Sequence, residues 1–218
     1  ALQLCDAAHA AGADAVKFQT FRAADLVVRG APTAEYQTRQ TGELDQYAML
    51  ERLELSEAQH VQIQAHCQAI GIEFFPTPFS IPAVDMLVRL GVHRLKLSSG
   101  ELTHRQLVEH AAATRLPLLM STGMGTMEEI TEALAWTRAA RGHLDGVVVM
   151  HCTSAYPAVD DTPNPTATEQ MRRDLGLPIA YSAHTPGTAA PLAAVAFCAS
   201  ATAQHLTLDR TPPGPAPS

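Results

Sequence analysis

Short apolar runs alternate along this chain with longer amphipathic stretches, beginning at Ala13. Most of the runs are apolar on both faces, which is typical of strands in a parallel sheet covered by helices. The runs are predicted to be β-strands over residues 13–19, 72–79, 93–99, 116–122, 146–153, 178–184 and 201–208.

The amphipathic stretches have the spacing of helices. They cover residues 2–12, 56–71, 81–91, 105–114, 126–141, 166–176 and 189–199. Ser56 and Thr126 are predicted N-caps, because their hydroxyls can accept from the first free backbone amides of a helix. Gly71, Gly91 and Gly176 stand where helices usually end in a left-handed residue.

The alternation of strand and helix predicts an α/β fold, and the number of strands favours a (β/α)8 TIM barrel over an open, doubly wound sheet. Seven strands are predicted and the chain begins inside a helical pattern, so we expect a barrel that lacks its first strand. Residues 1–210 are assigned to this barrel, and residues 211–218 to a Pro-rich linker or tail. The polar segment 22–55 is interpreted as an active-site loop.

A missing first strand has a physical consequence. The strands 13–19 and 201–208 would each lack the neighbour between them, and unpaired sheet edges promote association. On this basis the isolated chain is expected to be poorly soluble or oligomeric, and weakly active.

Composition narrows the class of protein. With 46% hydrophobic and 17% charged residues, the chain has the make-up of a folded domain. The net charge of −7 argues against nucleic acid or an anionic membrane surface as the main partner. No apolar run is long enough to cross a membrane, and the four cysteines lack metal-finger or C-x-x-C spacing. We therefore expect a cytoplasmic protein that binds small molecules.

Polar residues gather at the carboxyl ends of the predicted strands, where parallel barrels carry their active sites. They are Lys17, Gln19, Thr77, Lys96, Ser99, Glu101, Ser121, Thr122, His151, Ser154, Ser182, His184 and His205. Lys17 and Lys96 are each flanked by apolar residues. An inward ammonium needs an anion, so a substrate phosphate or carboxylate is favoured over a lysine that merely reaches to the rim.

The histidines divide into groups. His184 and His205 end adjacent predicted strands, where a metal site and a general base are both open interpretations. His151 fits either a hydrogen-bonded core histidine or a ligand, and His93 opens a strand at the end away from the expected site. The remaining six are expected on the surface without partners: His9, His60, His66, His104, His110 and His143.

Taken together, these strand ends resemble the N-acetylneuraminate (sialic acid) synthase family. The similar stretches cover residues 11–21, 46–57, 71–80, 96–102, 121–130, 151–157, 176–187 and 204–215, in the family's order. The combination of STGM, HCTSxYP and YSxHT is specific to that family.

The resemblance implies a barrel and a reaction. Members condense phosphoenolpyruvate with N-acetylmannosamine or a related N-acyl amino sugar, giving a sialic (nonulosonic) acid and phosphate. Two histidines that match His184 and His205 hold a divalent metal, manganese in the first place and magnesium as the alternative. Members also carry a C-terminal antifreeze-like domain that reaches over a partner's active site, so a homodimer is expected.

Residue roles follow by matching the motifs. Lys17, Lys96 and Glu101 correspond to catalytic positions. The positions that match substrate-binding residues are Gln19, Thr77, Phe79, Ser99, Ser154, Tyr156 and Ser182.

The chain also departs from the family pattern. Ala183 stands for an aspartate, Ala203 and Gln204 for a Glu-Lys pair, and Ala216 and Pro217 for an Asp-His pair. A second interpretation is therefore a catalytically impaired relative that binds a phosphorylated metabolite or serves as an assembly partner. A third is a Schiff-base aldolase that uses Lys96, which is disfavoured because Glu101 is expected to raise the pKa of that lysine.

Overall fold

The computed structural model describes residues 1–33, 45–152, 165–184 and 187–209. Ser154, Tyr156 and the tail 211–218 lie outside these described residues. The chain divides into two compact units, Ala1–Val92 together with the residues from Leu206 on, and His93–His205. They are called here the β1–β2 unit and the β3–β7 unit, and the assignment of residues 1–210 to a single domain stays a prediction.

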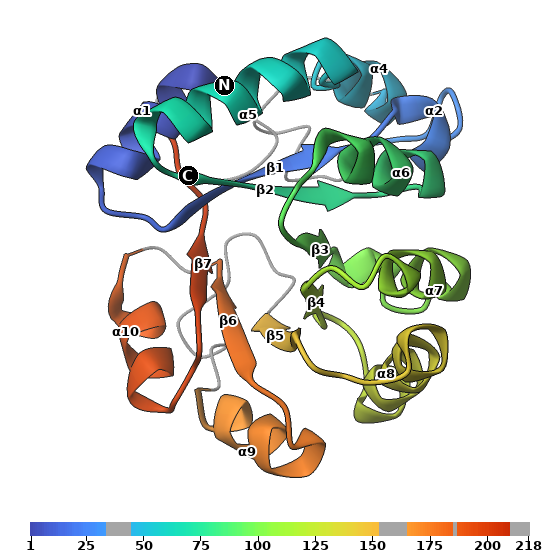
Figure 1. The fold of residues 1–218 in the computed structure, drawn as a ribbon, viewed down its shortest axis with the longest axis vertical. Helices are drawn as coiled ribbons and strands as arrows, with labels where there is room; N and C mark the ends of the chain where they lie inside the picture. The colour runs from blue at the N-terminus through green and yellow to red at the C-terminus, as the bar shows by residue number, and fades with distance from the viewer. Residues whose placement is uncertain (34–44, 153–164, 185–186, 210–218) are drawn as a thin grey trace. The chain divides into compact units, whose positions relative to one another are not determined.

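The β1–β2 unit holds two parallel strands, β1 (Ala15–Thr20) and β2 (Glu73–Pro78). Its helices are α1 (Leu2–Ala10), α2 (Ala23–Leu26), α4 (Gln46–Glu51), α5 (Glu57–Ile70) and α6 (Ile81–Leu90), as Figure 1 shows. The segment 22–55, interpreted as a loop, contains α2 and α4 in its described parts.

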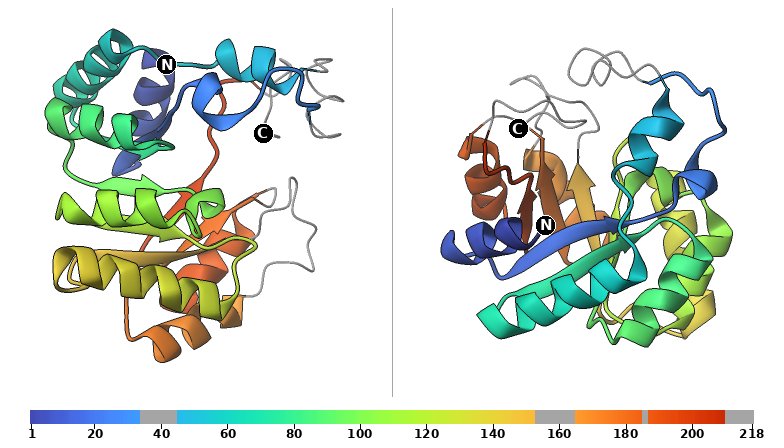
Figure 2. Two further views of the ribbon diagram at one scale, coloured as in Figure 1. Left: turned by 90° about the vertical axis from the view of Figure 1, so that its right-hand side faces the viewer. Right: turned by 90° about the horizontal axis from the view of Figure 1, so that it is seen from above.

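The β3–β7 unit is built on one parallel sheet. Its strands follow the chain order: β3 (Leu95–Leu97), β4 (Leu118–Ser121), β5 (Val147–Cys152), β6 (Ile179–Ala183) and β7 (Thr202–Gln204). A short 3-10 turn (Ser99–Glu101) follows β3. The helices are α7 (Arg105–Ala113), α8 (Met127–Arg141), α9 (Pro165–Leu175) and α10 (Ala189–Ala196). Figure 2 shows α7 and α8 side by side.

These elements confirm the α/β class and the position of every predicted strand, within a few residues at each end. The helix ends are set by local chemistry. Ser56 and Thr126 both form capping boxes, in which the hydroxyl accepts from the amide of Gln59 or Glu129 at 3.3 Å. Gly71 ends α5 with a φ of 80°, a conformation in which a side chain would be strained.

One face of the β3–β7 sheet packs against the helices (Figure 1). From α8, the Thr137 hydroxyl lies 3.8 Å from the sulfur of Met120 on β4. Tyr181 and Ala183 on β6 pack with Ala194 of α10 in a buried cluster. Since side chains alternate along a strand, the residues between these point to the opposite face of the sheet.

Candidate active site

The register of the β3–β7 sheet gathers polar residues on the face opposite the helices, called here the Lys96 face. Lys96 pairs with Leu119 of β4, and two residues further Ser121 pairs with Met150 of β5. Two residues further again, Cys152 pairs with Ser182 of β6. Alternation therefore places Lys96, Ser121, Cys152 and Ser182 on one face, nearest the carboxyl ends of the strands.

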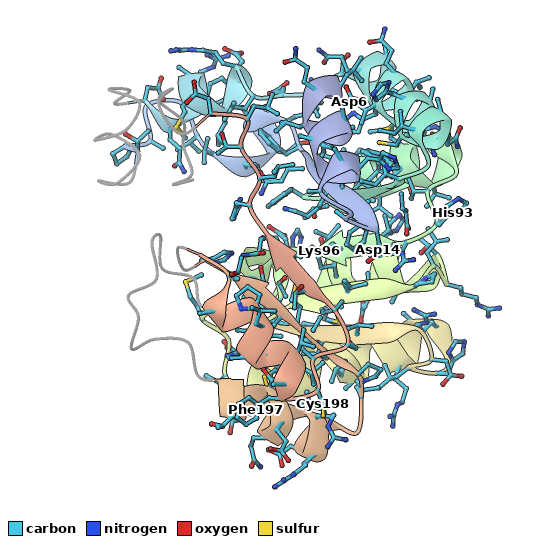
Figure 3. All side chains as sticks on the ribbon, turned by 90° about the vertical axis from the view of Figure 1, so that its left-hand side faces the viewer. Asp6, Asp14, His93, Lys96, Phe197 and Cys198 are labelled. Atoms are coloured by element: carbon cyan, nitrogen blue, oxygen red, sulfur yellow. The ribbon has the colours of Figure 1, made fainter. Side chains whose placement is uncertain are left out.

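Figure 3 labels Lys96 among the side chains. It is 9% exposed, and its burial lowers the pKa of the ammonium below the ordinary value. Cys152 is close enough to act on this pKa in the opposite direction, more weakly. A buried ammonium is costly unless an anion compensates it. The environment of Lys96 thus has the chemistry of a site for a phosphate or carboxylate.

Ser99, in the turn after β3, links three strand ends. Its hydroxyl accepts from the amide of Gly123, which follows β4, at 3.0 Å. The same oxygen lies 3.1 Å from the sulfur of Cys152, at the end of β5. The position of this predicted substrate-binding residue is therefore fixed by neighbours on both sides.

Ser121 was among the strand-end polar residues but not among the predicted site residues. Its hydroxyl is buried, with the residue 2% exposed, and it has no hydrogen-bond partner in the part of the chain that the structure describes. A buried hydroxyl without a partner is costly, which is a sign of a ligand that completes it. The sequence signal was its place at the end of an apolar run, which put Ser121 among the strand-end polar residues.

The β1–β2 unit presents its own polar face. Lys17 pairs with Phe75, and Gln19 pairs with Thr77, so these four side chains share one face of the two strands. Thr77 is 1% exposed, and its hydroxyl has no partner among the described residues. Phe79, just after β2, packs edge-on against Phe21 at 6.1 Å between ring centroids. The prediction that Lys17 and Thr77 form one anion site with Lys96 and Ser99 spans both units and stays a prediction.

His184 and His205 lie side by side. They follow Ala183 and Gln204, the last register pair of β6 and β7, and their ring centroids are 5.4 Å apart. The hydroxyl of Ser182 is 3.5 Å from Nε2 of His184. The expectation that these two imidazoles converge at neighbouring strand ends is confirmed.

The spacing of the two rings suits a shared metal ion. A metal–nitrogen bond of about 2.1 Å, plus about 1.1 Å to the ring centre, places each centre about 3.2 Å from the ion. Ligand angles of about 90–110° then give centroids roughly 4.5–5.2 Å apart, close to the observed 5.4 Å. Within the described residues, no group of three or more His, Cys, Asp and Glu side chains surrounds a metal position. The pair would thus contribute two ligands and leave the other positions open.

Glu101 bonds to His104 and not to Lys96. The carboxylate oxygen Oε2 lies 2.6 Å from Nδ1 of His104, with the two side chains 14% and 46% exposed. Glu101 does not contribute to the lowered pKa of Lys96. The expectation that Glu101 raises the pKa of Lys96 was therefore wrong. The turn after β3 places His104, three residues further on, within hydrogen-bond distance of the Glu101 carboxylate.

The prediction that six histidines lie on the surface without partners needs correction at His60, His66, His104, His110 and His143. Nδ1 of His143 lies 3.7 Å from a carboxylate oxygen of Asp145, and His110 also interacts with a neighbour. His60 is fully buried: its Nε2 is 2.8 Å from the Thr20 hydroxyl, and its Nδ1 is 2.9 Å from the carbonyl of Ser56. The signal in the sequence was the spacing of His60, Ile63 and Cys67, which forms the buried stripe of α5. His66 and His104 are not partnerless, since His66 lies 2.6 Å from Asp6 of α1.

His151 is the hydrogen-bonded core histidine of the two alternatives, but it lies on the helix-facing side. Its Nδ1 is 3.3 Å from the hydroxyl of Thr168 in α9, and its ring meets Tyr181 edge-on. Burial lowers the pKa of His151.

The family departures fall on different faces. Ala183 packs on the helix-facing side, in the cluster with Tyr181 and Ala194. Gln204 pairs with Ala183 and donates to the carbonyl of Gly187 at 3.1 Å. Ala203 pairs with Ser182, so it alone of these three lies on the Lys96 face. Ala216 and Pro217 are outside the described residues.

Comparisons with known proteins agree with this geometry. The sequence profile of the NeuB family matches residues 4–217. The chain belongs to the NeuB family. It is 41% identical over 218 residues to the N,N'-diacetyllegionaminic acid synthase of Legionella pneumophila, and 35% identical over 216 residues to the protein of the same name from Campylobacter jejuni. These alignments cover 99% of this chain and 61% and 65% of the two relatives.

A solved structure gives the same result. The N-acetylneuraminic acid (sialic acid) synthetase of Leptospira borgpetersenii, determined in complex with citrate, matches with a TM-score of 0.82 at 29% identity. The match covers 96% of this chain and 68% of that chain. The chain spans less than two thirds of the length of the legionaminic acid synthases of Legionella pneumophila and Campylobacter jejuni. Among the described residues, none of its helices is long and apolar enough to span a membrane.

Proposed function

We propose that this NeuB-family chain carries the catalytic face of an enzyme that condenses phosphoenolpyruvate with an N-acyl amino sugar to give a nonulosonic acid and phosphate. The observation that carries the proposal is Lys96, a buried ammonium on the same sheet face as Ser121 and Ser182. Phosphoenolpyruvate has a phosphate and a carboxylate on one small carbon skeleton, and it would compensate both the charge and the unpartnered hydroxyl.

The residues of this face are proposed to have separate binding roles. Lys96 and Ser99 donate to the anionic oxygens of phosphoenolpyruvate, and Ser121 and Ser182 complete the cradle. In the β1–β2 unit, Lys17 and Thr77 are proposed to contact substrate. The remaining proposed contacts to substrate are Gln19, Phe79, Glu101, Ser154 and Tyr156.

His184 and His205 are proposed to hold the divalent ion, manganese first and magnesium as the alternative. The ring spacing supports this role. When bound, the ion would act as a Lewis acid on the aldehyde oxygen of the sugar. Ser182, within 3.5 Å of His184, connects the two halves of the site.

The reaction balances without a redox partner. The methylene carbon of phosphoenolpyruvate forms the new bond to the aldehyde carbon, and the aldehyde oxygen takes up a proton. Water adds to the carbon that bears the phosphate, and the carbon–oxygen bond to phosphate breaks. The buried Lys96 and the half-buried Ser99 stabilise the phosphate and carboxylate charge while these bonds change.

N-Acetylmannosamine or a related N-acyl amino sugar is the proposed acceptor. The names of the relatives support this class, since they include synthases of N,N'-diacetyllegionaminic acid and of pseudaminic acid. The position of Ala183 and Gln204 away from the Lys96 face argues against catalytic impairment as their consequence. A (β/α)8 TIM barrel is proposed as the scaffold, which the parallel pairing within both sheets and the structural likeness support.

One observation favours a second candidate, a Schiff-base aldolase. A lysine nucleophile must be neutral, and burial lowers the pKa of Lys96 in that direction. If Lys96 formed a Schiff base with pyruvate, borohydride would reduce the C=N bond and leave a stable N-(1-carboxyethyl) group on the lysine. The condensation proposal predicts no such adduct by mass spectrometry.

The direct test is an assay of phosphate release from phosphoenolpyruvate with several N-acyl sugars, with and without manganese. Mass spectrometry of the product must show a nine-carbon keto acid for an N-acylhexosamine acceptor. Phosphate release that is independent of both sugar and metal would contradict the proposal.

A further inference from the structure

We propose that Cys152 is a positioning residue that directs the hydroxyl proton of Ser99 toward the bound anion. The inference rests on the proposed function, because it concerns the phosphoenolpyruvate side of that site. It assigns a role to a buried thiol that lies in the HCTSxYP stretch but is not among the predicted site residues.

The geometry places the thiol in the site. Cys152 is 7% exposed and lies on the Lys96 face, in register with Ser182. Its sulfur is 3.1 Å from Oγ of Ser99. Lys96 lies on the same face of the sheet as Cys152.

The number of protons and lone pairs on the Ser99 hydroxyl limits where its proton can point. A serine hydroxyl has one proton and two lone pairs. One lone pair accepts from the amide of Gly123 at 3.0 Å. If the thiol of Cys152 donates to the other lone pair, the hydroxyl proton is left for a substrate oxygen. If Ser99 donates to the sulfur instead, nothing is left to bind the anion.

The chemistry of sulfur favours the first arrangement once an anion is present. A thiol is a weak acceptor, whereas a phosphate or carboxylate oxygen is a strong, charged one. The Ser99 proton therefore turns to the anion, and the thiol proton turns to Ser99. Cys152 supports binding through Ser99, without a contact of its own to the substrate.

The experiment compares Cys152→Val and Cys152→Ser with the wild-type chain, using calorimetric titration with phosphoenolpyruvate. Valine fills the space of the thiol but donates nothing, so affinity should fall by about 3–10-fold. Serine keeps a donor and should remain within about twofold of wild type. Cys67→Val removes another buried thiol, on α5, and should leave the affinity unchanged.

A double-mutant cycle separates positioning from packing. Ser99→Ala alone should weaken binding by roughly 10–100-fold. If Cys152 acts through Ser99, Cys152→Val should add no further loss in the Ser99→Ala background. Thermal unfolding of each variant measures any damage to packing. Such damage would add to the loss in both backgrounds, whereas coupling through Ser99 removes the loss in the Ser99→Ala background.

Three results would overturn the inference: full affinity in Cys152→Val, equal losses in both backgrounds, or Cys152→Ser as weak as Cys152→Val. A wild-type chain that binds phosphoenolpyruvate but forms no nonulosonic acid would refute the proposed function, while the cycle would still decide the role of Cys152. A wild-type chain that binds no phosphoenolpyruvate would overturn both.

Discussion

The imidazoles of His184 and His205 lie with their ring centroids 5.4 Å apart, although 20 residues of chain separate them. The register of two parallel strands produces this proximity, because Ala183 and Gln204 are the last paired residues of β6 and β7. Helix α10 carries the chain back to the end where the strands begin, so that β7 runs parallel to β6 and both strands finish at the same edge.

Replacing either histidine by glutamine should weaken manganese binding. Loss of an outer-shell partner alone costs roughly 10–100-fold in affinity, so loss of a direct ligand should cost at least about tenfold. Electron paramagnetic resonance of free manganese measures this. His143→Gln is the control, since His143 lies near Asp145 in the turn before β5 and should bind manganese as the wild type does.

Anion binding should be coupled to proton uptake at Lys96. Burial lowers the pKa of Lys96 in the free protein, and an adjacent anion favours the charged form and raises the pKa again. Affinity for phosphoenolpyruvate should therefore fall as pH rises through the lowered pKa. Calorimetry in buffers of different ionisation enthalpy counts the protons taken up.

Lys96→Met provides the matched variant for that measurement. It keeps most of the apolar stem and removes the charge, so affinity should fall by about 1.5–3 kcal/mol and the proton uptake should disappear. Unchanged affinity in Lys96→Met would assign this lysine to structure.

The buried His60 should contribute to stability. His60→Leu removes a partner of the Thr20 hydroxyl and of the Ser56 carbonyl, which should cost about 2–4 kcal/mol in the free energy of unfolding. His66→Ala on the same helix removes an exposed pair with Asp6 and should cost no more than about 1 kcal/mol. Urea denaturation compares the two; equal losses would contradict a structural role specific to His60.

His151 should make the fold sensitive to acid. Its pKa is lowered in the folded protein, so the unfolded chain binds the proton more tightly. Above the ordinary pKa of about 6.5, His151 is neutral in both states and does not change the free energy of unfolding. Below that value the unfolded chain binds more protons, so the free energy of unfolding falls as the pH drops. His151→Gln should flatten the dependence of the unfolding midpoint on pH between about 6.5 and 5. An unchanged slope would place the acid sensitivity elsewhere.

The sequence predicts the helices and strands well, because runs that are apolar on both strand faces and N-cap residues can each be recognised within one segment of the chain. The strands and the caps at Ser56 and Thr126 needed no tertiary information. The partners of individual side chains did need it. The hydrogen bond between His60 and Thr20 becomes visible only when β1 is placed against α5. Glu101 was expected to act on Lys96, but the fold pairs it with His104.

The site itself was predictable as a set of strand ends, but not as a set of contacts. The alternation of side chains places the departures on different faces: Ala203 lies on the Lys96 face, and Ala183 packs against α10. The unpartnered Ser121 and the contact between Ser99 and Cys152 depend on register across three strands, which no single segment contains.

The most direct test of the account is anomalous diffraction from crystals of the chain grown with manganese and phosphoenolpyruvate. We predict one manganese peak about 2.0–2.3 Å from a ring nitrogen of both His184 and His205, with phosphoenolpyruvate bound to Lys96 and Ser99. Manganese bound elsewhere, or phosphoenolpyruvate density away from Lys96, would contradict the claim that this sheet face is the active site.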